Sequence, residues 1–155
     1  MIYIFFEFEN EKFWIEVDTN GYAQRQIVCK EGIYVLSCRT DCLAEGIVDI
    51  ENDCTQISSD LFNEIWEKNS SEIRSIWNTE KVKYPIGSHV DGTIRYFYPQ
   101  GIIFDLDNLQ GCANFDYCKE MSQPSSLYPS HVISGTVCGY DECNMWILLN
   151  NSKAD

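Results

Sequence analysis

The chain has 155 residues, of which 45% are hydrophobic and 14% aromatic. This composition is too apolar for a disordered chain, and the length suits one average domain or two small ones. No stretch approaches the roughly 20 consecutive apolar residues that a membrane-spanning helix needs, and the N-terminus lacks the basic region of a secretory signal. We therefore expect a packed, cytoplasmic protein.

The charge is strongly acidic, with 11 Lys or Arg against 24 Asp or Glu and a net charge of -13. Such a charge opposes attraction to nucleic acid or an anionic membrane, and a basic partner is its natural complement. An acidic surface that only keeps the protein in solution is the other explanation, and charge alone leaves both open. Residues 1–80 hold six basic and sixteen acidic side chains, a net of -10, while residues 81–155 hold five and eight, a net of -3.

The first part of the chain has the alternating pattern of strands. Strands are expected over Ile2–Glu9, Phe13–Val17, Tyr22–Cys29 and Ile33–Ser37, which gives a meander of about four antiparallel strands. We expect turns at Asn10-Glu11, at Asp18-Thr19-Asn20-Gly21 and at Glu31-Gly32.

Two helices are predicted to follow these strands. Ser58 or Ser59 suits an N-cap, and Leu61, Phe62, Ile65 and Trp66 recur at helical spacing. A second helical stretch covers Ser71–Trp77, although it could instead belong to a linker that ends at Tyr84-Pro85. We place a boundary between two subdomains after residue 80.

The remainder of the chain returns to short strands. They are expected over Ser88–Tyr98, Gly101–Leu106, Leu109–Phe115, His131–Gly139 and Met145–Leu149. We expect residues 116–130 to form an exposed loop or a single turn of helix, and residues 151–155 to form a polar tail. The expected fold class is α+β and mostly β: residues 1–80 form an antiparallel sheet with one or two helices. Residues 81–150 follow as a five-stranded barrel, and residues 151–155 as the tail.

Short glycine-containing segments in this second part carry a resemblance. They are Gly87–Ile94, Gly101–Leu106, Leu109–Ala113 and Ser134–Val137. The C-terminal half resembles the OB-fold RNA-binding repeat named for ribosomal protein S-one, which implies a five-stranded barrel with glycines where strands bend sharply. Gly111 is expected to permit the turn into the third strand.

The same resemblance identifies a candidate nucleic-acid surface. In that family two aromatic side chains and a histidine stack on bases, but the matching positions here hold Gln100, Ile103 and Asn114. A platform could be rebuilt from neighbouring basic and aromatic residues, with ordinary barrel packing as the other explanation. The candidates for this surface are Lys83, Arg95, Tyr96, Phe97 and Tyr98.

A second resemblance concerns the N-terminal half. Residues Ile15–Ile27 and Ile57–Glu67 are similar to a small bacterial domain family found among toxin and immunity modules. This resemblance implies an immunity-type protein, one that binds and neutralises a toxin encoded beside it.

No recognisable catalytic motif is present. His89 and His131 are the two histidines, and neither lies in a nucleophile elbow, a phosphate-binding loop or a dinucleotide fingerprint. The eight cysteines include no Cys-x-x-Cys pair, so we expect reduced, mostly buried thiols and no metal site. The sequence therefore predicts a non-enzymatic protein without catalytic residues, metal or cofactor.

The preferred hypothesis is an acidic protein that binds a basic protein partner, such as a co-encoded toxin with a nuclease domain. The alternative is binding of RNA or single-stranded nucleic acid by the barrel. Trp14, Tyr22 and Trp66 are considered as aromatic anchors, with core packing as the other explanation, which the helical stripe favours for Trp66. The acidic candidates for partner binding are Asp41, Glu45, Asp49, Glu51 and Asp53.

Overall fold

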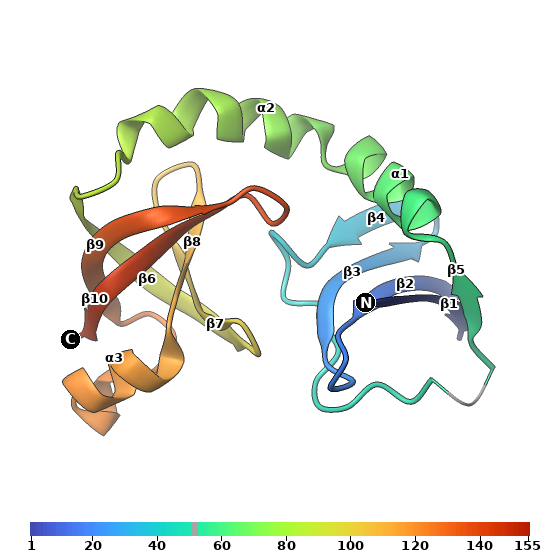
Figure 1. The fold of residues 1–155 in the computed structure, drawn as a ribbon, viewed down its shortest axis with the longest axis horizontal. Coiled ribbons are helices and arrows are strands. Elements are labelled where there is room, and N and C mark those ends of the chain that lie inside the picture. Colours follow the sequence, from blue (N-terminus) through green and yellow to red (C-terminus); the bar gives the residue numbers. More distant parts are fainter. Residues whose placement is uncertain (51–52) are drawn as a thin grey trace. The chain divides into compact units, whose positions relative to one another are not determined.

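The computed structural model describes residues 1–50 and 53–155 and divides the chain into two compact units, residues 1–72 and 73–155. Figure 1 shows a sheet with a covering helix in the first unit and a small barrel in the second. The predicted boundary after residue 80 coincides with the end of the second helix, eight residues after the division between these two units. The predicted fold class, a mostly β chain with a sheet and helices followed by a barrel, is confirmed.

The first unit contains a five-stranded antiparallel sheet with the order β4-β3-β2-β1-β5. Its strands are β1 (Ile2–Phe8), β2 (Glu11–Val17), β3 (Ala23–Lys30), β4 (Ile33–Leu36) and β5 (Thr55–Ile57). The meander of β1 to β4 agrees with the sequence analysis. Strand β5 is not among the predicted strands, because its three residues are too few to show an alternating pattern.

Tight two-residue turns join β1 to β2 and β3 to β4. Glu9 and Asn10 form the first and Glu31 and Gly32 the second, each with positive φ, which is the backbone conformation that matches the twist of a hairpin. The first turn therefore lies one residue earlier than predicted. Both turns project an exposed glutamate at the same end of the sheet.

Helix α1 (Ser59–Asn69) packs against β1 and β4 on one face of the sheet (Figure 1). It begins where predicted, because the Ser58 hydroxyl accepts the Leu61 N–H at 3.1 Å, and it buries Phe62 and Trp66. Helix α2 (Ser71–Glu80) and a 3₁₀ turn (η1, Lys81–Lys83) follow, so the second helical stretch is a helix rather than a linker. In the described ranges, no helix combines the length and apolar character needed to span a membrane.

The second unit contains a closed five-stranded barrel with the order β10-β8-β7-β6-β9 (Figure 1). Strands β8 and β10 are parallel, whereas the other neighbouring pairs are antiparallel. Helix α3 (Phe115–Met121) follows β8 and precedes β9 along the chain. This arrangement is consistent with an OB-like fold. The strands are β6 (His89–Tyr98), β7 (Gly101–Asp105), β8 (Gln110–Ala113), β9 (Val132–Asp141) and β10 (Trp146–Ala154).

Two local predictions in this unit need correction. The polar tail is wrong, because β10 continues through it to Ala154, which pairs with Ile133 and donates its N–H to the Ser122 hydroxyl at 2.8 Å. The connection after β8 is longer than a single helical turn: Asn114 caps α3 by accepting the Tyr117 N–H at 2.9 Å, and a 3₁₀ turn (η2, Pro124–Ser126) follows.

Gly111 lies within β8 rather than in the turn before it. A Cβ at this position would meet the fully buried ring of Phe104 and lie 2.6 Å from the Ile147 carbonyl oxygen. The glycine is thus required by close packing inside the barrel.

Candidate functional site

The connection between β4 and β5, residues 37–54, is called the acidic loop here because it carries all five predicted acidic candidates. Its first part is fixed against the sheet by hydrogen bonds to Gln26: the Ser37 hydroxyl accepts the Gln26 N–H at 2.9 Å, and the Ala44 N–H donates to Gln26 Oε1 at 2.8 Å. Within the loop, Ser37, Cys38 and Leu43 are buried. The loop therefore has a defined inner side and an outer side facing solvent.

The middle of the acidic loop is bonded to the backbone of Gly21 and Tyr22. The Val48 N–H donates to the Gly21 carbonyl at 2.8 Å, and Ile47 forms a β-bridge with Tyr22. Ile47 is 71% exposed and Tyr22 38% exposed. Backbone pairing thus places two exposed apolar side chains together, of which the sequence predicts Tyr22 but not Ile47 as a binding residue. An isoleucine within an acidic, polar segment is the sequence signal that was available for Ile47.

The described acidic candidates are all on the outer side of this loop. Asp41, Glu45, Asp49 and Asp53 are exposed, while Glu51 lies outside the described residues. Within the part of the chain that the structure describes, no ion pair neutralises Asp41, Glu45 or Asp53. The loop therefore combines several exposed carboxylates with exposed Ile47, which pairs with Tyr22, and this combination is suited to binding a basic surface.

The two tryptophans proposed as anchors belong to the interior of the first unit. Trp14 packs between Phe5 and Tyr34, with ring centroids 5.2 and 6.0 Å away, and is 9% exposed. Trp66, which belongs to α1, is fully buried. Tyr22 is therefore the predicted aromatic residue that the structure brings to the acidic loop.

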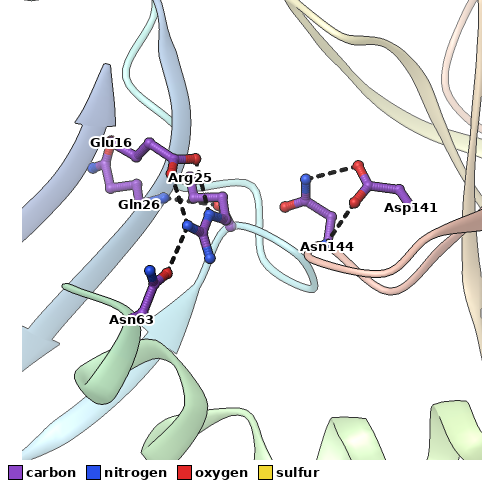
Figure 2. A network of polar contacts seen from close by, with 7 residues as sticks. Glu16, Arg25, Gln26, Asn63, Asp141 and Asn144 are labelled. Atoms are coloured by element: carbon purple, nitrogen blue, oxygen red, sulfur yellow. Dashed lines mark hydrogen bonds and ion pairs between the residues drawn. The ribbon is translucent and has the colours of Figure 1, made fainter. Parts of the chain in front are cut away.

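A buried ion pair lies between the sheet and α1 (Figure 2). Arg25 donates to both carboxylate oxygens of Glu16 at 2.9 and 2.7 Å and to Asn63 Oδ1 at 2.9 Å. Its guanidinium carbon lies 4.9 and 5.0 Å from the ring centroids of Phe62 and Trp66. Burial opposes ionisation of Glu16, but the hydrogen bonds and charge of Arg25 outweigh it and lower the pKa of that carboxyl. This network joins helix to sheet and has a structural role.

The candidate nucleic-acid residues do not form an open stacking platform. Tyr98 is buried, with its ring 6.1 Å from that of Trp146. Tyr96 donates to Gln110 at 3.2 Å, and Gln110 donates to Asp105 at 3.0 Å. Tyr98 is thus committed to packing, and Tyr96 to a chain of hydrogen bonds.

The two predicted cations of that surface are both paired with carboxylates. Arg95 Nε lies 3.3 Å from Asp105, and Lys83 Nζ lies 2.6 Å from Glu80. Phe97 remains 39% exposed, beside Phe115. Paired cations have less positive potential to offer a phosphate.

A groove of about 500 Å³ lies beside the start of β6 and the end of β7. Its acidic side chains are Asp91, Asp105 and Asp107, and His89 and Tyr84 also line it. Three carboxylates there would repel a phosphate backbone, so this groove does not favour nucleic acid.

Two cysteine thiols have raised pKa values, and each histidine ring lies beside an oxygen atom. Burial, with smaller contributions from Cys38 and Asp41, raises the pKa of Cys42 to about 12, and burial raises the pKa of Cys112 to about 12. His89 Nε2 lies 3.3 Å from Asp91, whereas His131 Nδ1 lies 3.1 Å from the Asp155 carbonyl. In residues 1–50 and 53–155, no three metal-ligating side chains gather into a potential metal site.

The chain was also compared with known proteins. No protein-family model matches it, and no curated protein is significantly similar to it.

Proposed function

We propose that this chain is a non-enzymatic binding protein of the immunity type, which acts in the cytoplasm by occupying and neutralising a basic protein toxin such as a nuclease domain. The observation that carries the proposal is the acidic loop, where Asp41, Glu45 and Asp53 are exposed and where exposed Ile47 pairs with Tyr22. A surface with apolar side chains inside a charged rim is the usual anatomy of a protein-binding site.

The charge of the protein supports the same proposal. The first 80 residues carry -10 of the total of -13, so the acidic loop lies in the strongly negative half of the chain. Complementary charge raises the association rate by about 10- to 1,000-fold at low salt and suppresses binding to acidic competitors. Carboxylates can also occupy positions that phosphates would take in the cleft of a nuclease.

The second candidate function is binding of single-stranded nucleic acid, which the OB-like barrel favours. The pairing of Arg95 with Asp105 and of Lys83 with Glu80 argues against it, as do the aspartates of the groove. A salt-dependent gel shift with single-stranded RNA tests this function, and we expect no shift at about 0.15 M salt.

The main experiment measures association with the product of the adjacent gene by surface plasmon resonance. We expect the variant Asp41→Lys/Glu45→Lys to slow association about tenfold at low salt and to weaken its salt dependence. The control variant Asp107→Lys/Glu120→Lys makes the same change of net charge on exposed residues of the second unit, and it should slow association much less.

Equal slowing by both variants would show that the total charge, and not the acidic loop, steers the partner. Failure of the adjacent gene product to bind, together with tight binding of single-stranded RNA, would transfer the function to the barrel.

A further inference from the structure

The face of the N-terminal sheet opposite α1 carries an apolar row that continues across four strands. Phe6 pairs with Phe13, Phe13 with Val28, and Val28 with Val35. Neighbouring residues along a strand point to opposite faces, and Glu16 and Arg25 belong to the set that faces α1. This row therefore points away from α1.

The acidic loop covers part of this face and leaves the rest open. The row at its covered end contains Ile4, Ile15 and Gln26, all buried, and Gln26 is the residue to which the loop is hydrogen-bonded. The apolar row that begins at Phe6 and ends at Val35 crosses β3 at Val28, two residues after Gln26. Its side chains are half-buried. The next row runs from Phe8 through the charged pair Glu11 and Lys30 to Ile33, and Phe8 and Ile33 are 63% and 68% exposed.

These uncovered side chains make a preformed surface, called the open sheet face here. It consists of Phe6, Phe8, Phe13, Val28, Ile33 and Val35. The rings of Phe6 and Phe13 are stacked with centroids 4.8 Å apart, and a groove of about 380 Å³ runs over Val28, Ile33 and Val35. A contiguous apolar patch on a regular sheet is typical of an interaction site, because scattered exposed apolar residues would not line up in this way.

The charged side chains at the edge of the open sheet face indicate which kind of molecule would bind there. Glu9 and Glu31 project from the two hairpin turns, and Glu11 lines the groove with Lys30, whose ammonium is 3.1 Å from the Glu11 carboxylate. The edge is therefore acidic overall. A second copy of this chain would bring the same acidic edge and the same net charge of -13, so self-association is opposed by repulsion.

We propose that the open sheet face is the apolar centre of the docking surface for a basic protein partner. The matching partner surface has aliphatic or aromatic side chains surrounded by Lys and Arg. This inference rests on the proposed function and adds to it the part of the surface that holds the partner after encounter. The acidic loop on the same face of the sheet governs the association rate, whereas the open sheet face governs the dissociation rate.

The test uses the full chain and the product of the adjacent gene as the probe. The variant Phe8→Ser/Ile33→Ser removes exposed apolar side chains only, so its melting temperature should stay close to that of the parent protein. We expect its dissociation rate to rise about tenfold or more, with an association rate changed less than about twofold.

Two further variants sharpen the measurement. Val82→Ser/Ile86→Ser removes apolar side chains that are 73% and 66% exposed elsewhere in the chain, and it should leave the dissociation rate unchanged. Glu9→Lys/Glu31→Lys reverses the acidic edge, and it should slow association at low salt.

The outcomes separate this inference from the proposed function. Binding with the same dissociation rate for Phe8→Ser/Ile33→Ser as for the parent would overturn the inference alone. No binding of the adjacent gene product to the parent protein would overturn both. A parent dimer in sedimentation equilibrium that becomes a monomer in Phe8→Ser/Ile33→Ser would assign the face to a second copy and overturn the proposed partner.

Discussion

Arg25 connects three parts of the first unit, because it bonds Glu16 on the neighbouring strand and Asn63 on α1 and lies over two aromatic rings. Replacing it by methionine keeps an apolar stem but leaves the Glu16 carboxylate buried without its cation. We expect Arg25→Met to lower the free energy of unfolding by about 3–5 kcal/mol, measured by urea denaturation at neutral pH.

Arg95→Met is the matched control for this change. Arg95 also pairs with a carboxylate, Asp105 at 3.3 Å, but its side chain is 59% exposed. Its loss should cost less than about 1 kcal/mol, because water already screens the pair. Similar losses for the two variants would show that burial does not set the strength of the Arg25 pair.

The same network predicts a pH dependence of stability. The pKa of Glu16 is lowered below its ordinary value of 4.5 in the folded protein, so ionised Glu16 stabilises the fold above that pH. This contribution is lost as the pH falls through the lowered pKa. The difference in unfolding free energy between the parent and Glu16→Gln should therefore be constant near neutrality and shrink below about pH 4.5.

Comparison of those two proteins cancels the other carboxylates, which titrate in both. Urea denaturation at intervals from neutral to acidic pH measures the difference. A gap that stays constant into the acid range would contradict the lowered pKa of Glu16.

Gly111 gives a residue-level prediction for the barrel. Gly111→Ala places a Cβ against the Phe104 ring and the Ile147 backbone, so it should destabilise the protein by about 1–3 kcal/mol in thermal or urea unfolding. Gly139→Ala in β9 is the control, because its Cβ would lie 3.9 Å from Leu148 Cδ1 and meet no closer atom. A tolerated Gly111→Ala with a damaging Gly139→Ala would contradict the packing described for β8.

At the scale of elements, Glu142 ties the β9–β10 hairpin to α2. Its carboxylate accepts Trp77 Nε1 and Lys81 Nζ, each at 2.7 Å, and its carbonyl accepts Arg74 at 2.7 Å. The hydrogen bond from Lys81, against a smaller effect of burial, lowers the pKa of Glu142. The hairpin thus contacts Arg74 and Trp77 of α2 and Lys81 of η1 through one residue.

Glu142→Ala should loosen α2 without unfolding the barrel. Since the carboxylate is partly exposed, we expect a loss of about 1 kcal/mol, seen as roughly fivefold faster hydrogen exchange of α2 amides. Glu120→Ala on α3 is the control and should leave α2 exchange unchanged. Equal protection of α2 in the parent and in Glu142→Ala would contradict this role.

Local sequence patterns predicted the elements well where they extend over several residues. The alternation in β1–β4 and the Ser58 cap with its apolar spacing depend on neighbours in the chain, so the sequence alone predicted them. β5 and the end of β10 depend on strands far away in sequence: β5 pairs with β1, and Ala154 pairs with Ile133. Such pairing turns polar residues into a strand without leaving a local pattern.

The acidic loop and the open sheet face also differ in how much of them the sequence alone can predict. Negative charge can be counted from the sequence, and the exposed positions of Asp41, Glu45, Asp49 and Asp53 agree with a surface loop. Exposure of aromatic side chains cannot be counted, because it depends on which face of the sheet is covered. Trp14 lies under α1, whereas Phe8 and Ile33 remain open on the other face.

At the scale of the whole molecule, the charge that favours a basic partner also has a cost for the fold. A net charge of -13 on 155 residues makes the folded chain repel itself, and most of that charge lies in the first 80 residues. Association with a cationic partner would relieve the repulsion. The surface proposed for binding is thus also a source of instability in the free protein.

This repulsion predicts that salt stabilises the free protein. Raising NaCl from about 0.01 M to about 0.15 M shortens the Debye length from about 30 Å to about 8 Å, which screens charges across the molecule. Exposed ion pairs lose little by this, since each is worth about 1 kcal/mol or less. We therefore expect the melting temperature to rise by about 2–4 °C, equivalent to about 1 kcal/mol, in a thermal unfolding experiment. The variant Asp41→Lys/Glu45→Lys/Asp107→Lys/Glu120→Lys has a much smaller net charge and should gain less from the same salt. A melting temperature that falls with added NaCl, or a gain as large in this variant as in the parent, would show that local ion pairs outweigh the net charge in setting stability.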